Sequence, residues 1–280
     1  MDGITPGDAL WLRADPVSLQ FHQDQLVLLG PDRLEECRVL TPWSAYRFWQ
    51  RPTILIILNT MSDREAMLQD ILWEVEVTRR YVGKDALDAR VMRVMAEVPR
   101  ERFVPEEMRS MAFRNGPVPI GHGQTISQPY IVALMTDLLA PEPDHVILEV
   151  GTGSGYQAAV LSRLVRKVYS LEIIEPLATA AKQRLSELGY DNVEVHNTDG
   201  YQGLPEHAPY DGIIVTAAAP FIPPPLLEQL KPGAHLVIPV GRPGWSQELK
   251  LLEKLADGQV REKDVLEVAF VPLTGKLGQA

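Results

Sequence analysis

The stretch HVILEVGTGSGY, residues 145–156, decides the fold of this chain. Its first half is an aliphatic run that predicts a buried strand, and its second half places Gly151, Gly153 and Gly155 directly behind that strand. Glycines let a backbone turn sharply and approach a ligand closely, because they have no Cβ. Doubly wound sheets bind their cofactors at this position, the carboxyl end of the first strand.

The sequence alternates between strand-like and helical stretches from residue 144 onward. The strands are continuous apolar runs, which is typical of a parallel sheet with helices on both faces. Because the last two strands follow without a helical pattern, we expect an antiparallel pair at that edge. The predicted fold class is α/β, a doubly wound, mostly parallel, seven-stranded Rossmann-like sheet. Its strands are expected at residues 145–150, 167–173, 193–197, 212–216, 235–240, 249–255 and 265–272, and its helices at residues 156–165, 176–188 and 224–230.

Two helices are predicted well ahead of this sheet. Ser62 followed by Glu65 is a capping box, and apolar residues at helical spacing come after it. A second helix is expected over residues 85–97, ended by Pro99. The chain is therefore expected to have three regions. These are an extension at residues 1–60 with no assigned fold, a helical substrate-side region at residues 61–140, and a cofactor-binding sheet at residues 141–280, the last two forming one domain.

The composition of the chain favours a globular protein and disfavours several kinds of partner and site. Hydrophobic residues make up 45% of the chain and charged residues 23%, which is typical of a globular protein, and the formal net charge is −10. This charge disfavours a nucleic-acid partner, because such proteins usually carry a basic face. The single cysteine, Cys37, excludes an internal disulfide and a cysteine-rich zinc site. The longest aliphatic run, residues 54–58, is too short for a membrane span. We expect a cytoplasmic protein, and the six histidines show no metal-ligand spacing.

Acidic residues at the ends of the next strands indicate which cofactor is bound. Glu172 ends the second strand, where its carboxylate is suited to the two ribose hydroxyls of an adenosine. Asp199 and Gly200 follow the third strand, where the carboxylate is expected near the adenine amino group. Asp211 is a weaker candidate, and a turn residue is an equally good reading of it. The spacing GxGxG and the lack of a phosphate-binding Lys-Ser/Thr pair favour a nucleoside without phosphates, which predicts S-adenosylmethionine.

Several segments resemble one family, the protein-L-isoaspartate O-methyltransferases. They read VPRERFVPE at residues 98–106, GQTISQPYIVALMTDLL at 123–139, LEVGTGSGYQAAVLS at 148–162, APYDGIIVTAAAP at 208–220, LLEQLKPGAHLVIPVG at 226–241 and FVPLTGK at 270–276. They occur in the order of the family and cover roughly residues 66–276. The GTGSGY loop is shared with many methyltransferases, whereas TISQP is much more diagnostic.

The resemblance implies methylation of the free α-carboxylate of L-isoaspartyl residues in damaged proteins. The methyl ester then closes to a succinimide, whose hydrolysis returns part of the material to normal aspartate. The carboxylate is already ionised at pH 7, so the reaction needs alignment and exclusion of water and no general base. Ser127 matches the position that the family uses at its active site, and we interpret its hydroxyl as a donor that orients the substrate carboxylate.

Thr125 and Ser127 also have a structural interpretation, as an N-cap pair for a helix at residues 129–139 with Pro129 in its first turn. Capping and substrate binding are compatible, since a helix N-terminus is itself an anion site. We therefore expect both roles. The full set of expected site residues is Ser127 as catalytic residue; Thr125, Ile126 and Ser127 for the substrate; Gln128, Glu149, Gly151, Thr152, Gly153, Ser154, Gly155, Glu172, Asp199, Gly200 and Thr274 for the cofactor; and none for a metal.

Two alternatives remain open. The first is an S-adenosylmethionine-dependent methyltransferase with another substrate. Methylation of a base amino group is disfavoured, because residues 215–220 read VTAAAP where such enzymes need a polar-aromatic motif. The second is a non-catalytic nucleoside-binding regulatory protein. The intact GTGSG loop, Glu172, Asp199 and TISQP disfavour it.

The N-terminal extension departs from the family, whose bacterial members begin near the helix at Ser62. One hypothesis is that Met61 is the native start, and the alternative is an accessory segment that packs on the catalytic domain. The expected partners are isoaspartyl proteins and peptides, with no nucleic acid and no membrane, and the expected state is a monomer.

Overall fold

The computed structural model of the protein describes residues 18–22, 25–29, 39–40, 61–242 and 245–275. The chain divides into two compact units, Met1–Met61 and Ser62–Ala280. This division lies one residue from the boundary expected from the sequence.

The first unit contains a small antiparallel sheet. Its strands are β1 (Ser18–His22), β2 (Gln25–Leu29) and β3 (Val39–Leu40), in the order β1-β2-β3. The sequence pattern predicts no fold here, because strands of at most five residues are too short to establish a period. The five prolines and three tryptophans of residues 1–60 all lie outside the described residues.

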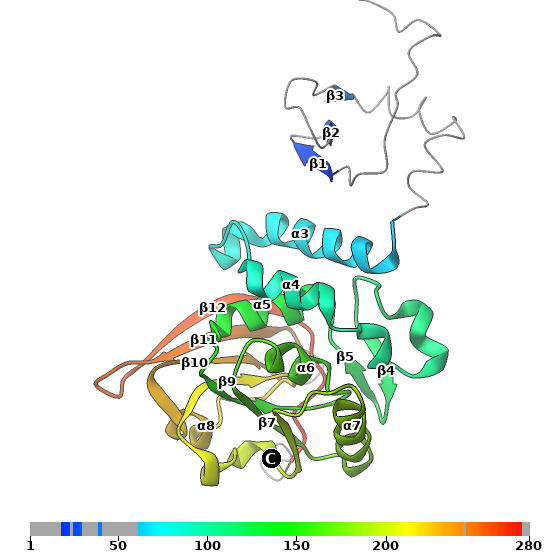
Figure 1. Ribbon diagram of the computed structural model, residues 1–280. Coiled ribbons are helices and arrows are strands. Elements are labelled where there is room, and N and C mark those ends of the chain that lie inside the picture. Colours follow the sequence, from blue (N-terminus) through cyan, green and yellow to red (C-terminus); the bar gives the residue numbers. More distant parts are fainter. Residues whose placement is uncertain (1–17, 23–24, 30–38, 41–60, 243–244, 276–280) are drawn as a thin grey trace, which may run out of the picture. The chain divides into compact units, whose positions relative to one another are not determined.

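A seven-stranded sheet organises the second unit (Figure 1). Its strands lie in the order β12-β11-β10-β9-β6-β7-β8. The pairs from β8 through β10 are parallel, whereas β11 pairs antiparallel with both β10 and β12. The predicted mostly parallel sheet with an antiparallel edge is therefore confirmed. The strands are β6 (Val146–Val150), β7 (Lys167–Glu172), β8 (Val193–Asn197), β9 (Tyr210–Val215), β10 (Leu230–Val240), β11 (Gln247–Lys254) and β12 (Val260–Val268).

Helices cover both faces of this sheet, and the neighbours Ile147 and Leu148 of β6 point into opposite hydrophobic clusters. The cluster around Ile147 includes residues of five helices, and the cluster around Leu148 includes residues of a short helix and a 3-10 turn. The first set is α3 (Asp63–Val82), α4 (Ala89–Glu97), α5 (Pro129–Leu139), α6 (Tyr156–Ser162) and α7 (Glu175–Glu187), and the second is α8 (Pro224–Glu228) and η3 (Gly200–Gln202).

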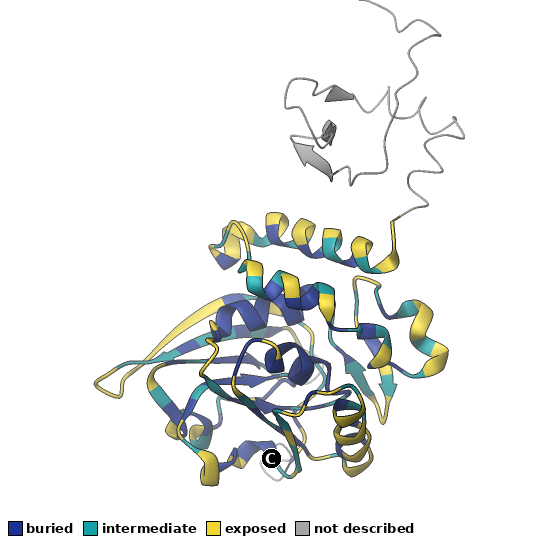
Figure 2. Cartoon of the chain, viewed as in Figure 1, coloured by how far each residue is buried: buried dark blue, intermediate teal, exposed yellow. Residues whose placement is uncertain are grey.

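α5 is fully enclosed, as is α6, and all of its residues are buried (Figure 2). It contacts α3 and α4 on one side and β9 and β10 on the other. A helix that is buried all round is typical of the interior of a layered fold. Within the part of the chain that the structure describes, no helix has both the length and the apolar character needed to cross a membrane.

Some of the predicted helix starts and caps agree with the structure, and others do not. The capping box at α3 is confirmed, since Ser62 Oγ accepts from the Glu65 backbone and Glu65 Oε2 accepts from the Ser62 backbone. α4 begins later than expected, because Asp88 is its N-cap. The bounds of α5 are confirmed, but the predicted capping by Thr125 and Ser127 is wrong. Gln128 occupies the N-cap position without a side-chain cap hydrogen bond, and the proline in the first turn needs no donor partner.

Two strand predictions near the C-terminus are also displaced. β10 begins at Leu230 rather than at residue 235, and its register with β9 shifts between Leu230 and His235. The last strand covers Val260–Val268 rather than residues 265–272, because Val260 pairs with Lys254 across a tight connection. The apolar residues beyond Val268 leave the sheet and reach the site described below.

Candidate active site

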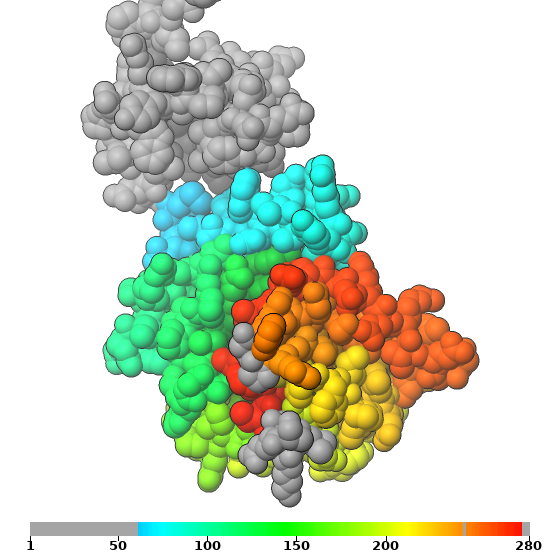
Figure 3. All heavy atoms as spheres, turned by 180° about the vertical axis from the view of Figure 1, so that it is seen from behind, coloured from blue at the N-terminus to red at the C-terminus, as the bar shows by residue number. Residues whose placement is uncertain are grey.

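One cavity lies at the carboxyl ends of four parallel strands. The chain enters it after β6, β7, β8 and β9, which is where doubly wound sheets bind ligands. Two further segments complete it, one before α5 and one near the C-terminus, which Figure 3 shows in red between the green and yellow parts of the chain. The lining residues are 124–127, Val132, 150–154, Tyr156, Gln157, 171–174, Gly200, Thr216, Ala217 and 271–274.

The glycine loop between β6 and α6 has the backbone conformation that the sequence predicts. Gly151, Gly153 and Gly155 have φ values of 101°, 53° and 88°, in the region that favours glycine. A Cβ on Gly151 would lie 2.5 Å from Thr216 Oγ1, so this glycine is also needed for space. Gly155 is the N-cap of α6 and packs against Leu185 rather than lining the cavity.

Glu172 lies at the end of β7, buried, with its carboxylate held by the backbone on both sides. Its Oε2 accepts from the Gly153 N–H at 2.8 Å, and its Oε1 accepts from the Ile174 N–H at 2.9 Å. Each carboxylate oxygen keeps a further lone pair for an incoming hydroxyl donor. Glu172 and Tyr156 are the only ionisable side chains among the described residues that line the cavity. The cavity wall therefore has a carboxylate that can accept hydrogen bonds from a nucleoside. Within the described lining, no second ionisable group is placed to serve as a general base for a nucleophile.

The TISQP segment forms another wall of the same cavity. Thr125 and Ile126 belong to β5 (Gln124–Ile126), which pairs with β4 (Val118–Gly121) in a small antiparallel ladder. Thr125, Ile126 and Ser127 all line the cavity together with the glycine loop. The next residue, Gln128, points elsewhere, since its amide donates to Glu74 and Asn115.

Arg100 supports this wall from inside the protein and was not among the predicted site residues. It is buried in η1 (Arg100–Arg102), where Nε donates to the Ala112 carbonyl and Nη2 donates to the Ser127 carbonyl, each at 2.6 Å. Its guanidinium also lies 4.8 Å from the centroid of the Tyr156 ring. Burial lowers the pKa of this arginine. The sequence signal for it is an arginine inside the VPRERF segment, which periodicity alone does not mark as buried.

Glu149 lies beneath the glycine loop and does not line the cavity. Its side chain is fully buried, Oε2 accepts from the Ser170 hydroxyl, and Oε1 has no hydrogen-bond partner. Burial raises the pKa of Glu149 to about 8, against the opposing effect of the Ser170 hydrogen bond. The group is thus largely protonated at neutral pH.

The other acidic candidates do not line the cavity either. Asp199 is the N-cap of η3, its Oδ1 accepts from the Tyr201 N–H at 3.0 Å, and its carboxylate lies directly behind Gly275. Asp211 lies at the opposite end of the sheet, where it accepts from the Val146 N–H and from Lys231 Nζ. Burial alone would raise the pKa of Asp211, but these partners lower it.

The structure therefore gathers most of the predicted site residues around one cavity. Those that line it are Thr125, Ile126, Ser127, Gly151, Thr152, Gly153, Ser154, Glu172, Gly200 and Thr274, and those that do not are Gln128, Glu149, Gly155 and Asp199. Their individual roles stay predictions. The lining residues that sequence reasoning missed are chiefly apolar, such as Leu171, Ile173 and Ala217, which a strand pattern does not distinguish from core residues.

Known proteins are similar to this chain across all the segments that line the cavity. A family model described as protein-L-isoaspartate(D-aspartate) O-methyltransferase matches residues 72–278. A protein-L-isoaspartate O-methyltransferase 2 of Polaromonas sp. is 61% identical over 210 residues, which cover 75% of this chain and all of that protein. Another, of Syntrophobacter fumaroxidans, is 59% identical over 212 residues, which cover 76% of this chain and 86% of that protein.

Solved structures agree with these relatives. One protein-L-isoaspartate O-methyltransferase is 29% identical with a TM-score of 0.64, and covers 76% of this chain and 67% of that one. A Plasmodium falciparum protein assigned to the same activity, in complex with S-adenosyl-L-homocysteine, is 25% identical with a TM-score of 0.60, and covers 73% of this chain and 97% of that one. By its sequence and its fold, this chain belongs to the protein-L-isoaspartate(D-aspartate) O-methyltransferase family.

Proposed function

We propose that the cavity transfers the methyl group of S-adenosylmethionine to the free α-carboxylate of L-isoaspartyl residues in damaged proteins. Family membership supports the reaction, and one observation of the structure supports this cavity as the place where it occurs. The TISQP segment and the glycine loop, with Glu172 beside it, form walls of a single cavity. An acceptor held by the first wall and a nucleoside held by the second are therefore brought into contact.

The residues present fit the cofactor. Glu172 offers carboxylate oxygens to ribose hydroxyls, and the apolar side chains of Leu171, Ile173 and Ala217 suit an adenine ring. The described lining has no lysine or arginine, which a phosphate-bearing ligand would need. When bound, S-adenosylmethionine supplies an electrophilic methyl group on a sulfonium centre.

The chain contributes alignment rather than proton transfer. An α-type carboxylate has a pKa of about 3.5, so it reaches the site ionised and no residue has to remove a proton. Ser127 lines the cavity, and in this proposal its hydroxyl donates a hydrogen bond that orients this carboxylate, while Arg100 binds the backbone carbonyl of Ser127. Fixing two reactants in the right geometry and excluding water supplies on the order of 7–11 kcal/mol.

The test is methyl transfer by the full-length protein to an isoaspartyl peptide and to its normal aspartyl twin, measured with labelled cofactor. We expect transfer to the isoaspartyl peptide alone. Equal transfer to both peptides would indicate a methyltransferase with another acceptor. Cofactor binding without transfer to either peptide would indicate a nucleoside-binding regulatory protein.

We further propose that the protein works as a cytoplasmic monomer without a nucleic-acid or membrane partner. The net charge of −10 supports the lack of a nucleic-acid partner, and the single Cys37 suits a reducing compartment. Sedimentation velocity over a range of concentrations tests the oligomeric state. A second, faster boundary that grows with concentration would contradict a monomer.

A further inference from the structure

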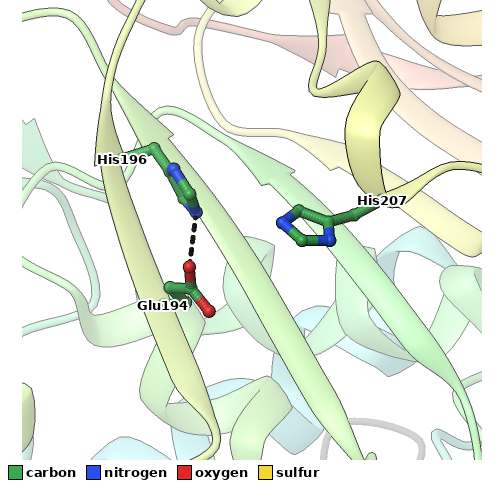
Figure 4. A group of neighbouring side chains, drawn as sticks. All are labelled: Glu194, His196 and His207. Carbon is green, nitrogen blue, oxygen red and sulfur yellow. Dashed lines mark ion pairs between the residues drawn. The ribbon is translucent and has the colours of Figure 1, made fainter.

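A cluster of two histidines and one glutamate lies on the edge strand of the sheet, apart from the cavity (Figure 4). Glu194 and His196 come from β8, and His207 comes from η4 (Pro205–His207). One ligand-type atom of each residue lies within 4.8 Å of the other two. Because the histidines lie on different elements, their spacing in the sequence does not reveal this cluster.

The backbone explains why these side chains meet. Glu194 and His196 are two positions apart on a strand, so they point to the same face of the sheet. Tyr169 pairs with Glu194 in the neighbouring strand β7 and therefore shares that face. The His207 ring stacks on the Tyr169 ring, with centroids 4.1 Å apart and planes inclined by 10°. This stacking places the histidine of η4 beside the strand.

The nitrogen of His196 that faces the cluster lacks a hydrogen-bond partner. His196 Nε2 is enclosed by the protein and makes no hydrogen bond, although it lies 3.1 Å from Glu194 Oε1 (Figure 4). An unprotonated imidazole nitrogen and a carboxylate oxygen are both acceptors, so they repel each other at this distance. Either a proton on the nitrogen or a metal ion between the two groups removes that repulsion.

We propose that Glu194, His196 and His207 form a binding site for a divalent transition-metal ion, for which Zn²⁺ is the best match. Two imidazoles and one carboxylate are ligands that Zn²⁺ prefers, and three protein ligands leave a position for water. Tetrahedral bonds of about 2.1 Å place neighbouring ligand atoms ~3.4 Å apart. The Glu194–His196 pair is already close to this spacing, at 3.1 Å, and His207 and Glu194 are exposed, so small side-chain rotations complete the site.

Lys167 is the natural competitor of such an ion. Its Nζ pairs with Glu194 Oε2 at 2.9 Å, while Oε1 of the same carboxylate faces His196. The carboxylate can therefore serve the lysine and the metal with different oxygens. Repulsion between the two cations weakens metal binding, so removal of the lysine charge is expected to strengthen it.

Occupancy of this site links two parts of the fold. β8 is the last strand at its edge of the sheet, and η4 belongs to the connection that leads to β9. A shared ion would hold this connection against the strand. Because the unfolded chain does not assemble these ligands, a bound ion raises the melting temperature through linkage. Methyl transfer is expected to be unchanged, since none of the three residues lines the cavity.

The experiment uses the untagged full-length protein, freed of metals with a chelator, and titrates it with Zn²⁺ by calorimetry. The variants are His207→Gln, which removes an exposed ligand, and Lys167→Gln. The matched control is His235→Gln, a partly buried histidine on β10. We expect His207→Gln to weaken one equivalent of Zn²⁺ binding at least tenfold and to abolish the metal-dependent rise in melting temperature. Lys167→Gln is expected to strengthen that equivalent, and His235→Gln to leave it unchanged.

Several results would overturn the site. Wild-type protein that takes up no Zn²⁺ would do so, and so would full retention of binding in His207→Gln, which would place the metal elsewhere in the chain. An equal loss in His235→Gln would show that binding is not specific to the cluster. Melting temperatures measured without metal verify that each variant is folded before it is titrated.

Discussion

Glu172 shows how one side chain connects the sequence motif to the cavity. Its carboxylate receives backbone N–H groups from the glycine loop and from the start of α7, so it fixes the loop as well as facing the cavity. A carboxylate at a strand end is recognisable in the sequence. The two backbone bonds are not, because they depend on the loop conformation.

Substitution Glu172→Ala is expected to weaken binding of S-adenosylmethionine roughly 100-fold or more. Two hydrogen bonds to the ribose are lost, each worth on the order of 1–3 kcal/mol, and the loop loses its anchor. Calorimetric titration measures the change. Glu175→Ala, at an exposed carboxylate on the next element, is the matched control. Wild-type affinity in Glu172→Ala would rule out the ribose contact.

Substitution Ser127→Ala is expected to lower kcat about 10- to 100-fold and to leave cofactor affinity nearly unchanged. The change removes one hydrogen bond to the substrate carboxylate, worth ~1.5–3 kcal/mol for a charged acceptor. The backbone carbonyl that Arg100 binds is retained. Steady-state kinetics with the isoaspartyl peptide and calorimetry with the cofactor separate the two effects, and Ser110→Ala at an exposed serine is the control. Loss of cofactor binding in Ser127→Ala would show that this division of roles is wrong.

Glu149 is expected to make stability depend on pH. The unfolded chain releases this proton near pH 4.5, whereas the folded protein keeps it up to about pH 8, because burial raises the pKa. The folded state thus binds more protons in this window, and the free energy of unfolding falls as the pH rises through it. In Glu149→Gln this decline is expected to shrink by on the order of 4 kcal/mol. Urea unfolding at pH 5 to 9 without cofactor measures it, and an unchanged slope would contradict the buried proton.

At the scale of elements, the sequence predicts what depends on local chemistry. The capping box of α3, the bounds of α5 and the glycine loop all follow from residues close together in the chain. The start of β10 does not, because pairing with β9 extends the strand back to Leu230 through a register shift. The N-cap of α5 is missed for a related reason, since Thr125 pairs across a hairpin with Pro119 and is drawn into a strand.

Arg100 joins η1 to the segments at Ala112 and Ser127, and Arg100→Lys tests that role. Lysine has the charge but not the planar fork that reaches the carbonyls of Ala112 and Ser127 together. We expect the free energy of unfolding to fall by about 2–3 kcal/mol and KM for the isoaspartyl peptide to rise. Urea unfolding and kinetics measure these effects. The exposed Arg102→Lys is the control, and a variant indistinguishable from it would exclude the positioning role.

At the scale of the molecule, the alternation of strands and helices predicts the sheet and its parallel core, and the structure adds a small sheet in the first unit. The cavity as a whole was not predictable from spacing, because segments 124–127 and 271–274 meet only through the fold. The Polaromonas relative aligns over its whole length with 75% of this chain, so a quarter of the chain has no counterpart there.

We propose that the second unit alone carries the activity. A protein that starts at Met61 keeps every described element of the seven-stranded sheet and every lining residue of the cavity. We therefore expect it to fold and to methylate the isoaspartyl peptide with kcat and KM within about twofold of the full chain. Circular dichroism and kinetics measure this, and a loss of activity in a folded protein would assign a role to residues 1–60. Mass spectrometry of the protein from its source tests separately whether Met61 is the native start.

The segment 271–274 has a consequence for how the cavity is lost when the protein unfolds. It returns from the sheet to form an isolated bridge with the stretch after β9, where Ala218 pairs with Pro272, and it supplies a wall of the cavity. Segments outside the paired strands open more easily than the core of a sheet. Mild heating is therefore expected to detach this wall, and with it the ability to hold a ligand, before the seven strands separate.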